Sequence, residues 1–273
     1  MQNLSPPGPQ SQHKNLVFTS AGDYSNIQQW LGESPNWDLW LCYYGDTSHS
    51  LAKQARYYTE HKGGKFPNLY YAYQHWPTIF EHYDAVFVLD DDIVISCDAI
   101  NRLFTARTRH DLWLLQPSFS PRGKISHRLT KARGLRYLTY TNFVEVCTML
   151  FRRDKFEQFM AIYDPKLVGW GVDLWCTHLF SGEQNRFAVV HDIICENPHD
   201  KFKSGDREID KLQHQDKRIK VWEEIRKKNA IPITEIHEYQ TIRQPLTPKN
   251  LLRAISIFII RKYYRFLSKR EQP

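Results

Sequence analysis

The sequence predicts an α/β domain with a mostly parallel central sheet and a helical extension at its C-terminal end. Three observations predict this class: short, nearly continuous apolar runs recur along the chain, helical patterns separate them, and turn residues bound most of the runs. A chain of 273 residues with 41% hydrophobic content can bury a core of this kind, and its length suits a single domain.

Six apolar runs predict strands. They bury both faces in a parallel sheet, so they should be apolar throughout, and the fourth should end at Pro117, which cannot donate to a strand ladder. In chain order these runs are 15–19, 37–44, 85–89, 112–116, 143–151 and 187–195.

Six segments between or beside the strands carry apolar residues at helical spacing. Pro77 should bend the third of them, because proline removes a backbone donor and crowds the preceding turn. In chain order these expected helices are 27–31, 51–60, 68–80, 98–107, 155–163 and 172–180.

We expect three parts along the chain. Residues 1–14 are polar, contain prolines and lack the apolar core of a signal peptide, which predicts a flexible tail. Residues 15–230 hold the alternating pattern and predict the main domain, and residues 231–273 predict a linker and a terminal helix. The five cysteines are scattered with no close pair, which is typical of reduced thiols and favours a cytoplasmic protein.

Asp90, Asp91 and Asp92 directly follow the apolar run 85–89. Three adjacent carboxylates repel one another, so the sequence predicts a cation that neutralises them. Hard oxygen ligands at the carboxyl end of a strand suit Mg²⁺ or Mn²⁺, which in turn binds a diphosphate. A solvated acidic loop that happens to follow a strand is the alternative interpretation.

Polar residues also follow the first two expected strands: Ser20 to Asp23 after one, and Gly45 and Asp46 after the other. Ligands of parallel sheets bind beyond the carboxyl ends of the strands, so we expect these residues to converge on the aspartate triplet.

Positive charge near this edge is a further candidate for phosphate contact. Lys65 follows two glycines and can approach a phosphate, although the complete phosphate-binding loop pattern is absent. The range 112–144 contains six Lys or Arg residues, His127 and no acid. Such a connection can hold phosphate oxygens or an anionic acceptor, and an ordinary solvated loop explains the same residues equally well.

Two further carboxylates stand in unusual contexts. Glu145 interrupts the apolar run 143–147, so it faces solvent at an edge strand, pairs with another group, or lines a site. Asp173 follows the segment 169–171, in which two glycines permit a tight turn and Trp170 offers a flat face for a sugar ring. Asp173 falls in the first turn of a helix, where a carboxylate is either a cap or a general base.

The net charge of +7 belongs to the C-terminal end, because residues 247–273 hold seven Lys or Arg and one acid. The rest is nearly neutral, which argues against a nucleic-acid partner. Apolar residues recur there at helical spacing, but the uncharged stretch 254–260 is too short to span a bilayer. The segment predicts a basic amphipathic helix, either lying on an anionic membrane surface or packed on its own domain.

Five segments occur in a fixed order: Phe-Val-Leu-Asp-Asp-Asp-Ile, Leu-Leu-Gln-Pro-Ser, Thr-Asn-Phe-Val-Glu-Val, Gly-Trp-Gly-Val-Asp and Val-Val-His-Asp. Together they resemble a plant and bacterial family of glycosyltransferases that was long catalogued as a domain of unknown function and is similar to GT-A-fold enzymes. The resemblance covers residues 16–210. It implies a single Rossmann-like GT-A domain, within 15–230, that binds a nucleotide-sugar through Mn²⁺ or Mg²⁺.

The resemblance also implies residue roles. Asp90 and Asp92 would hold the metal, Asp91 would contact the nucleotide, and Asp173 would be the base on the acceptor side, with Glu145 as a second candidate catalytic residue. The implied nucleotide pocket comprises Thr19, Ser20, Ala21, Gly22, Asp23, Asp46 and Lys65.

The third metal ligand departs from the family pattern. GT-A enzymes commonly place a histidine after the last core strand, and this chain has Asn197 there, with His199 two residues later. We expect His199, in preference to His191, to complete the metal shell.

The resulting hypothesis is a metal-dependent glycosyltransferase that moves a sugar from a nucleoside-diphosphate sugar to a glycan or lipid-linked acceptor. It would act in the cytoplasm, with the basic helix as a peripheral contact to the inner membrane face. Another metal-dependent phosphate-transfer enzyme and a non-catalytic binding protein with the same fold remain alternatives. The Asp-x-Asp-x-Thr phosphatase pattern is absent, because Ile93 and Val94 follow the triplet.

Overall fold

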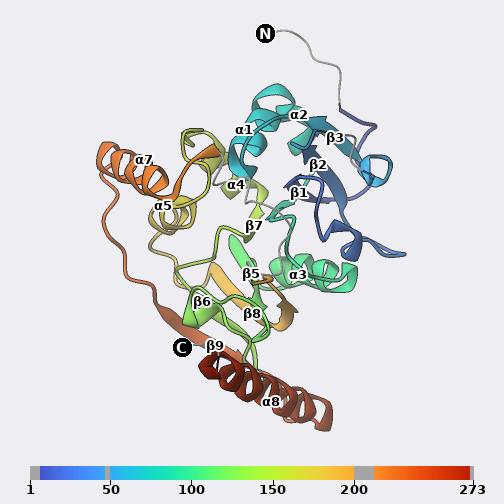
Figure 1. Ribbon diagram of the computed structural model, residues 1–273, viewed down its shortest axis with the longest axis vertical. Coiled ribbons are helices and arrows are strands. Elements are labelled where there is room, and N and C mark those ends of the chain that lie inside the picture. The colour runs from blue at the N-terminus through green and yellow to red at the C-terminus, as the bar shows by residue number, and fades with distance from the viewer. Residues whose placement is uncertain (1–6, 47–49, 200–211, 271–273) are drawn as a thin grey trace.

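The computed structural model describes residues 7–46, 50–199 and 212–270 (Figure 1). Within these ranges, one nine-stranded sheet runs through the molecule in the order β3–β2–β1–β4–β7–β5–β8–β6–β9. The strands are β1 (Asn15–Ala21), β2 (Asp38–Tyr43), β3 (Tyr57–Glu60), β4 (Ala85–Leu89), β5 (Leu114–Phe119), β6 (Arg136–Thr141), β7 (Thr148–Arg152), β8 (Phe187–Cys195) and β9 (Glu238–Arg243).

The sheet is mixed, which corrects the expectation of a mostly parallel one. Strands β3, β2, β1 and β4 pair in parallel, as do β5 and β8. Strand β7 lies antiparallel between β4 and β5, and β6 lies antiparallel between β8 and β9. The apolar run of β7 reflects burial on both faces, and burial alone does not distinguish the two strand directions.

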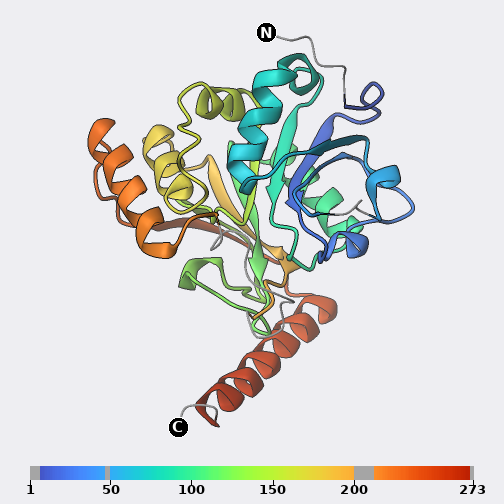
Figure 2. The same cartoon turned by 45° about the horizontal axis from the view of Figure 1, so that its top comes forward.

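Helices cover both faces of the sheet, as the sequence predicts (Figures 1 and 2). Alternate residues of each central strand point to opposite faces, so Phe18 and Val88 join one core cluster while Val17 and Phe87 join the other. On the first face lie α1 (Lys65–His75), α2 (Pro77–Phe80), α4 (Arg153–Met160), α5 (Val172–Leu179) and α7 (Gln215–Lys228), and on the second lies α3 (Cys97–Arg109).

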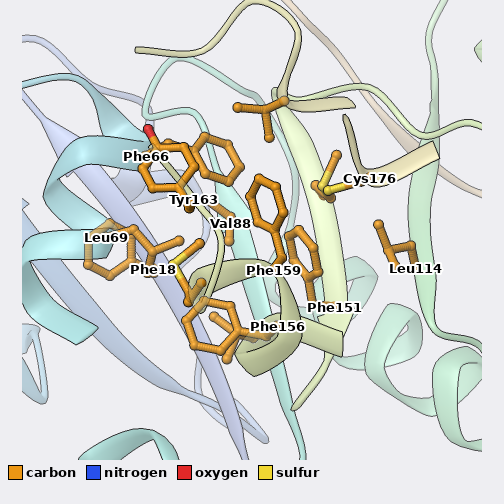
Figure 3. Close-up of a cluster of buried hydrophobic side chains, with 14 of the residues drawn as sticks. Phe18, Phe66, Leu69, Val88, Leu114, Phe151, Phe156, Phe159, Tyr163 and Cys176 are labelled. Atoms are coloured by element: carbon orange, nitrogen blue, oxygen red, sulfur yellow. The ribbon is translucent and has the colours of Figure 1, made fainter. Parts of the chain in front are cut away.

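The first core cluster is rich in aromatic rings (Figure 3). Phe159 of α4 stacks on Phe151 of β7 at 6.1 Å between ring centroids, and its edge meets Phe66 of α1 at 6.3 Å. These contacts hold α1 and α4 against the middle of the sheet. Because Lys65 is the first residue of α1, they also fix the position of Lys65. All five cysteines are free thiols, four of them buried.

Several predicted elements differ in kind or extent. The range 51–60 holds a short 3₁₀ turn, Ala52–Gln54, followed by β3, not a helix. The helix expected at 68–80 begins at Lys65 and breaks at Trp76, so that Pro77 starts α2, where its missing N–H costs nothing.

Two strand predictions were wrong at their ends. Strand β5 continues through Pro117. The β5–β8 register shifts between Pro117 and Ser118, so the strand pairing tolerates the N–H group that proline lacks. The strand expected at 143–151 begins only at Thr148.

Both predicted boundaries of the main domain need correction. At the N-terminal end, the amides of Gln12 and His13 donate to the Asp38 carboxylate, and the Pro7 carbonyl accepts from Tyr58, so residues 7–14 pack along β2 and β3. At the other end, the range 231–273 contains β9, which pairs with β6, and the sheet therefore continues beyond residue 230.

The terminal helix α8 (Pro248–Arg270) is the longest helix that the structure describes. None of the described helices has a stretch that is both apolar enough and long enough to cross a bilayer.

Candidate active site

The aspartate triplet follows β4 at the point where the sheet changes its order of connection. From β1 the chain proceeds outward through β2 and β3 and then returns to β4 on the other side of β1. In open α/β sheets the ligand crevice lies at this switch point, beyond the carboxyl ends of the strands. The Gly22 amide, directly after β1, donates to Asp91 Oδ2 at 3.2 Å, so the predicted convergence of these two segments is present.

The segment after β1 holds the backbone of the triplet in a defined turn. The Asn26 amide donates to the Asp91 carbonyl at 2.7 Å, and the Asn26 side chain donates to the Asp92 carbonyl at 2.6 Å. The Trp30 indole N–H donates to the Ile93 carbonyl at 2.7 Å. The triplet is therefore an ordered part of the fold, and not a loose acidic loop. A side chain at Gly22 would meet the Tyr44 ring at 2.8 Å, so only glycine allows this close packing.

Lys65 connects the triplet with the loop before β7. Its side chain is only 9% exposed, and its Nζ lies 2.6 Å from Asp90 Oδ1 and 2.7 Å from the Val146 carbonyl oxygen. The Asp90 amide in turn donates to the carbonyl of Cys147 at 3.0 Å. The lysine that the sequence assigns to a phosphate is thus an internal counter-charge of the triplet.

The three neighbouring carboxylates of the triplet repel one another. Enclosure by protein, together with the negative charges of Asp92 and Asp90, raises the pKa of Asp91 to about 8, although Gly22 and Lys65 act in the opposite direction. A ligand that brings a cation or a hydrogen-bond donor to Asp91 would relieve this repulsion.

Glu145 lies in the loop between β6 and β7, not in a strand as the sequence predicts. It is 5% exposed, which excludes the solvent-facing interpretation. The Thr130 hydroxyl donates to Glu145 Oε1 at 2.5 Å, and the Glu145 amide donates to Gln116 Oε1 at 2.5 Å. Burial and the charge of Asp173 raise the pKa of Glu145 to about 7.

Asp173 occupies the first turn of α5, where Gly171 precedes it with φ of 97°. A Cβ atom on Gly171 would lie 2.4 Å from the Trp222 ring of α7, so this tight turn requires glycine. Burial raises the pKa of Asp173 to about 6, partly opposed by backbone N–H donors that include Leu174 and Val146.

Val146 joins the two acidic groups into one site. Its backbone lies near enough to the Asp173 carboxylate to lower the pKa of that group, and its carbonyl accepts from Lys65, whose Nζ contacts Asp90. Cys147, the next residue, lies close enough to Asp90 and Glu145 for both charges to raise the pKa of its thiol. The triplet and Asp173 therefore both lie beside the short loop that contains Glu145.

The rest of the predicted nucleotide pocket is only partly available to a ligand. Thr19 and Ala21 have no exposed surface, because both belong to the core strand β1. Ser20 is occupied by a 3.0 Å hydrogen bond from Asn68, and Asp23 accepts from the Tyr43 hydroxyl. Asp46 has a 90% exposed side chain and pairs with Lys62 at 2.7 Å.

The predicted metal ligands do not form a complete shell. Within residues 7–46, 50–199 and 212–270, no group of three or more His, Cys, Asp and Glu side chains is arranged to hold a metal, so Asp90, Asp92 and His199 are not preassembled. The strand end before His199 nevertheless lies beside the triplet, because Glu196 and Val94 exchange two 2.9 Å backbone hydrogen bonds.

His191 is a core residue and not a ligand. It is fully buried, its Nε2 lies 3.1 Å from the Thr139 hydroxyl, and burial and nearby arginines lower its pKa to about 3. This agrees with the sequence preference for His199.

The basic range 112–144 is not one connection, because it contains β5, a 3₁₀ turn and β6. Arg133 and Arg136 both pair with Glu238 of β9, and so hold an edge strand. Thr130 instead reaches Glu145. Sequence reasoning missed Gln116 and Thr130 as site residues; a buried glutamine in the apolar run 112–116 was the available signal for the first.

The raised pKa of Glu145 predicts a pH-dependent loss of stability. A carboxyl whose pKa rises from 4.5 to about 7 on folding binds more protons in the folded state, so stability falls as pH rises through that window, by about 3 kcal/mol. We expect Glu145→Gln to lose less unfolding free energy than the wild type between about pH 5 and pH 8 in urea titrations. The exposed Glu224→Gln is the control. Parallel curves for Glu145→Gln and the wild type would show that Glu145 ionises normally.

No protein-family model and no curated protein matches this sequence. Solved structures of S. aureus TarS are similar to it in part. TarS 1–349 has a TM-score of 0.49 and 11% identity over 90% of this chain and 80% of that one. A longer TarS chain scores 0.44 with 12% identity over 68% and 36%, and TarS 1–349 in complex with UDP-GlcNAc scores 0.43 with 12% identity over 71% and 60%. Similarity at this level does not assign a function.

Proposed function

We propose that this protein is a glycosyltransferase that moves a sugar from a nucleoside-diphosphate sugar to the hydroxyl of a glycan or lipid-linked acceptor. One observation carries the proposal: the crowded carboxylates after β4 and the partly buried carboxylate of Asp173 lie near the same loop, which Lys65 contacts at the Val146 carbonyl. The first group suits binding of a charged donor, and the second suits removal of a proton.

The donor set of the triplet fits a small divalent cation. Mg²⁺ and Mn²⁺ take oxygen ligands and are commonly held by one or two carboxylates together with substrate phosphates. Asp90 and Asp92 would supply these carboxylates, and the absence of a third protein ligand in the described chain agrees with phosphates completing the shell. When bound, the ion would neutralise charge on the departing nucleoside diphosphate.

Asp173 would act as the general base. Its pKa of about 6 keeps it largely ionised near pH 7 and still basic enough to accept a proton from an acceptor hydroxyl as that oxygen attacks the sugar. The Leu174 amide donates to Asp173 Oδ1 at 3.0 Å and holds the carboxylate in place. Direct attack assisted by one base predicts inversion at the anomeric carbon. Glu145, with a pKa of about 7, can hold a proton beside it.

Donor binding can be tested before the sugar is known. We expect UDP or GDP to raise the melting temperature only when Mn²⁺ is present, because the nucleotide alone would add negative charge beside the carboxylates of the triplet. At about 100 times Kd the stabilisation is about 2.7 kcal/mol, which is several degrees in a thermal-shift assay.

EDTA added to the same samples should abolish the shift, and inorganic phosphate with Mn²⁺ serves as the ligand control. If no nucleoside diphosphate stabilises the protein with Mn²⁺, the proposal is wrong. If nucleotides bind, analysis of the products separates the classes: a glycoside supports a transferase, and free phosphate indicates a phosphohydrolase.

A further inference from the structure

Helix α8 packs on the domain with only one of its sides. The guanidinium of Arg253 bonds the carbonyl of His191 and lies 3.4 Å from Asp192 Oδ1. Ala254 sits so close to Gly134 that a Cβ there would be 2.3 Å from the Ala254 Cα. Ile257 is 8% exposed and completes this contact. Figure 2 shows the rest of the helix extending away from the domain.

The opposite side of α8 is mainly apolar, with the exposed Lys262 among its apolar side chains. Successive residues turn by about 100°, and the exposed apolar side chains fall within an arc of roughly 140°, centred away from Arg253 and Ile257. All of them are between 44% and 68% exposed: Leu251, Leu252, Ile255, Phe258, Ile259, Tyr263 and Phe266. Exposure of this many large apolar groups on one face contributes nothing to folding and marks an interaction surface.

The charges beside this surface are all of one sign. The sequence 248–270 contains no acid. Lys249 and Arg261 are exposed and flank the apolar arc on either side, and the Lys262 ammonium lies 5.3 Å from the centre of the Phe258 ring. Long basic side chains beside an apolar stripe can keep their charge in water while their stems cover apolar groups.

We propose that this face of α8 binds the surface of an anionic lipid bilayer, with the helix axis in the membrane plane. The apolar arc would enter the boundary between headgroups and acyl chains, and the flanking cations would contact lipid phosphates. A second copy of the chain is the less suitable occupant, because two such helices would bring like charges together without the acidic partners that a helix pair uses.

The other side of α8 faces the segment that follows the aspartate triplet. A cavity of about 510 Å³ lies between Ile257 and Ile260 of the helix and Val94 and Ile95, which follow the aspartate triplet. A membrane-bound α8 would therefore bring the site to the bilayer, which suits a lipid-linked acceptor. This last step rests on the proposed function, whereas membrane binding itself does not.

Vesicle flotation with the full chain tests the proposal. We expect the protein to bind phosphatidylcholine vesicles that contain phosphatidylglycerol. Most of this binding should be lost with pure phosphatidylcholine vesicles or at about 0.5 M NaCl. The triple variant Ile255→Ser, Phe258→Ser, Ile259→Ser should lose binding, because about 0.8 kcal/mol is lost for each CH₂ no longer inserted. The exposed residues Ile233 and Leu246, changed to Ser together, should leave it intact.

Charge reversal isolates the electrostatic part. Lys249→Glu with Arg261→Glu should lower the vesicle affinity by about tenfold or more, since each cation near the surface contributes about 1 kcal/mol. Lys217→Glu with Lys220→Glu on α7, also exposed, is the matched control. Equal binding of the wild type and the Ser variant to vesicles would overturn the proposal. The proposal would also be overturned if the wild type does not bind anionic vesicles and instead forms a dimer, seen by light scattering, that the Ser variant does not form. Neither experiment needs nucleotide, so its outcome is independent of transferase activity.

Discussion

Asp173→Asn is expected to lower kcat by roughly 10²–10⁴-fold while the affinity for the donor nucleotide stays the same. Asparagine keeps the size of the side chain and an acceptor oxygen for the Leu174 amide, so the first turn of α5 should persist. The substitution removes the group that takes up the proton of the acceptor hydroxyl. It therefore removes stabilisation of the transition state and leaves donor binding unchanged.

The same assignment predicts the acidic limb of the pH–rate profile. The base must be ionised, so kcat/KM should fall as pH drops through about 6, the pKa that burial gives Asp173. The control is Asp164→Asn, because Asp164 also accepts a local backbone hydrogen bond, from Lys166 at 3.0 Å, but lies outside the site. Turnover of Asp173→Asn equal to that of the control would identify Asp173 as a helix cap alone.

The meeting of the triplet with the end of β1 could be predicted from sequence because it depends on a general property of parallel strands. Runs such as 85–89 are apolar throughout, so their strand character was evident, and the loops after neighbouring parallel strands must lie at one edge. Gly22 and Asp91, separated by 69 positions, meet in this way.

The environment of Glu145 could not be predicted in the same way. Phe143 and Val144 are fully or almost fully buried although they belong to a loop, so hydrophobicity indicated a strand where burial comes from tertiary packing. Burial and the charge of Asp173 raise the pKa of Glu145, and the Thr130 hydroxyl donates a hydrogen bond to its carboxylate. Both residues come from distant segments. No local pattern records such contacts.

Strands β6 and β9 were missed for the opposite reason. Strand β9 is partly exposed along its whole length, and the first residues of β6 carry polar side chains, so neither shows a continuous apolar run. Their pairing depends partly on Arg133 and Arg136 meeting Glu238, more than 100 positions away. An excess of positive charge that looks local in sequence is thus balanced by a remote acid.

Asp92→Ala is expected to abolish Mn²⁺-dependent nucleotide binding, with a loss of affinity of roughly 100-fold or more, as calorimetric titration with UDP or GDP would measure. Asp92 is one of the two carboxylates proposed to hold the ion, so removing it leaves a poor site. Binding of nucleotide without Mn²⁺ should be equally weak in the variant and the wild type.

Stability separates this loss from unfolding. The melting temperature of Asp92→Ala, measured beside that of the wild type, shows whether the variant is folded under the conditions of the titration. Asp98→Ala is the matched control, since Asp98 is 78% exposed at the start of α3, a few residues beyond the triplet. A normal Mn²⁺-dependent titration of Asp92→Ala would show that the crowding of these carboxylates serves something other than a metal.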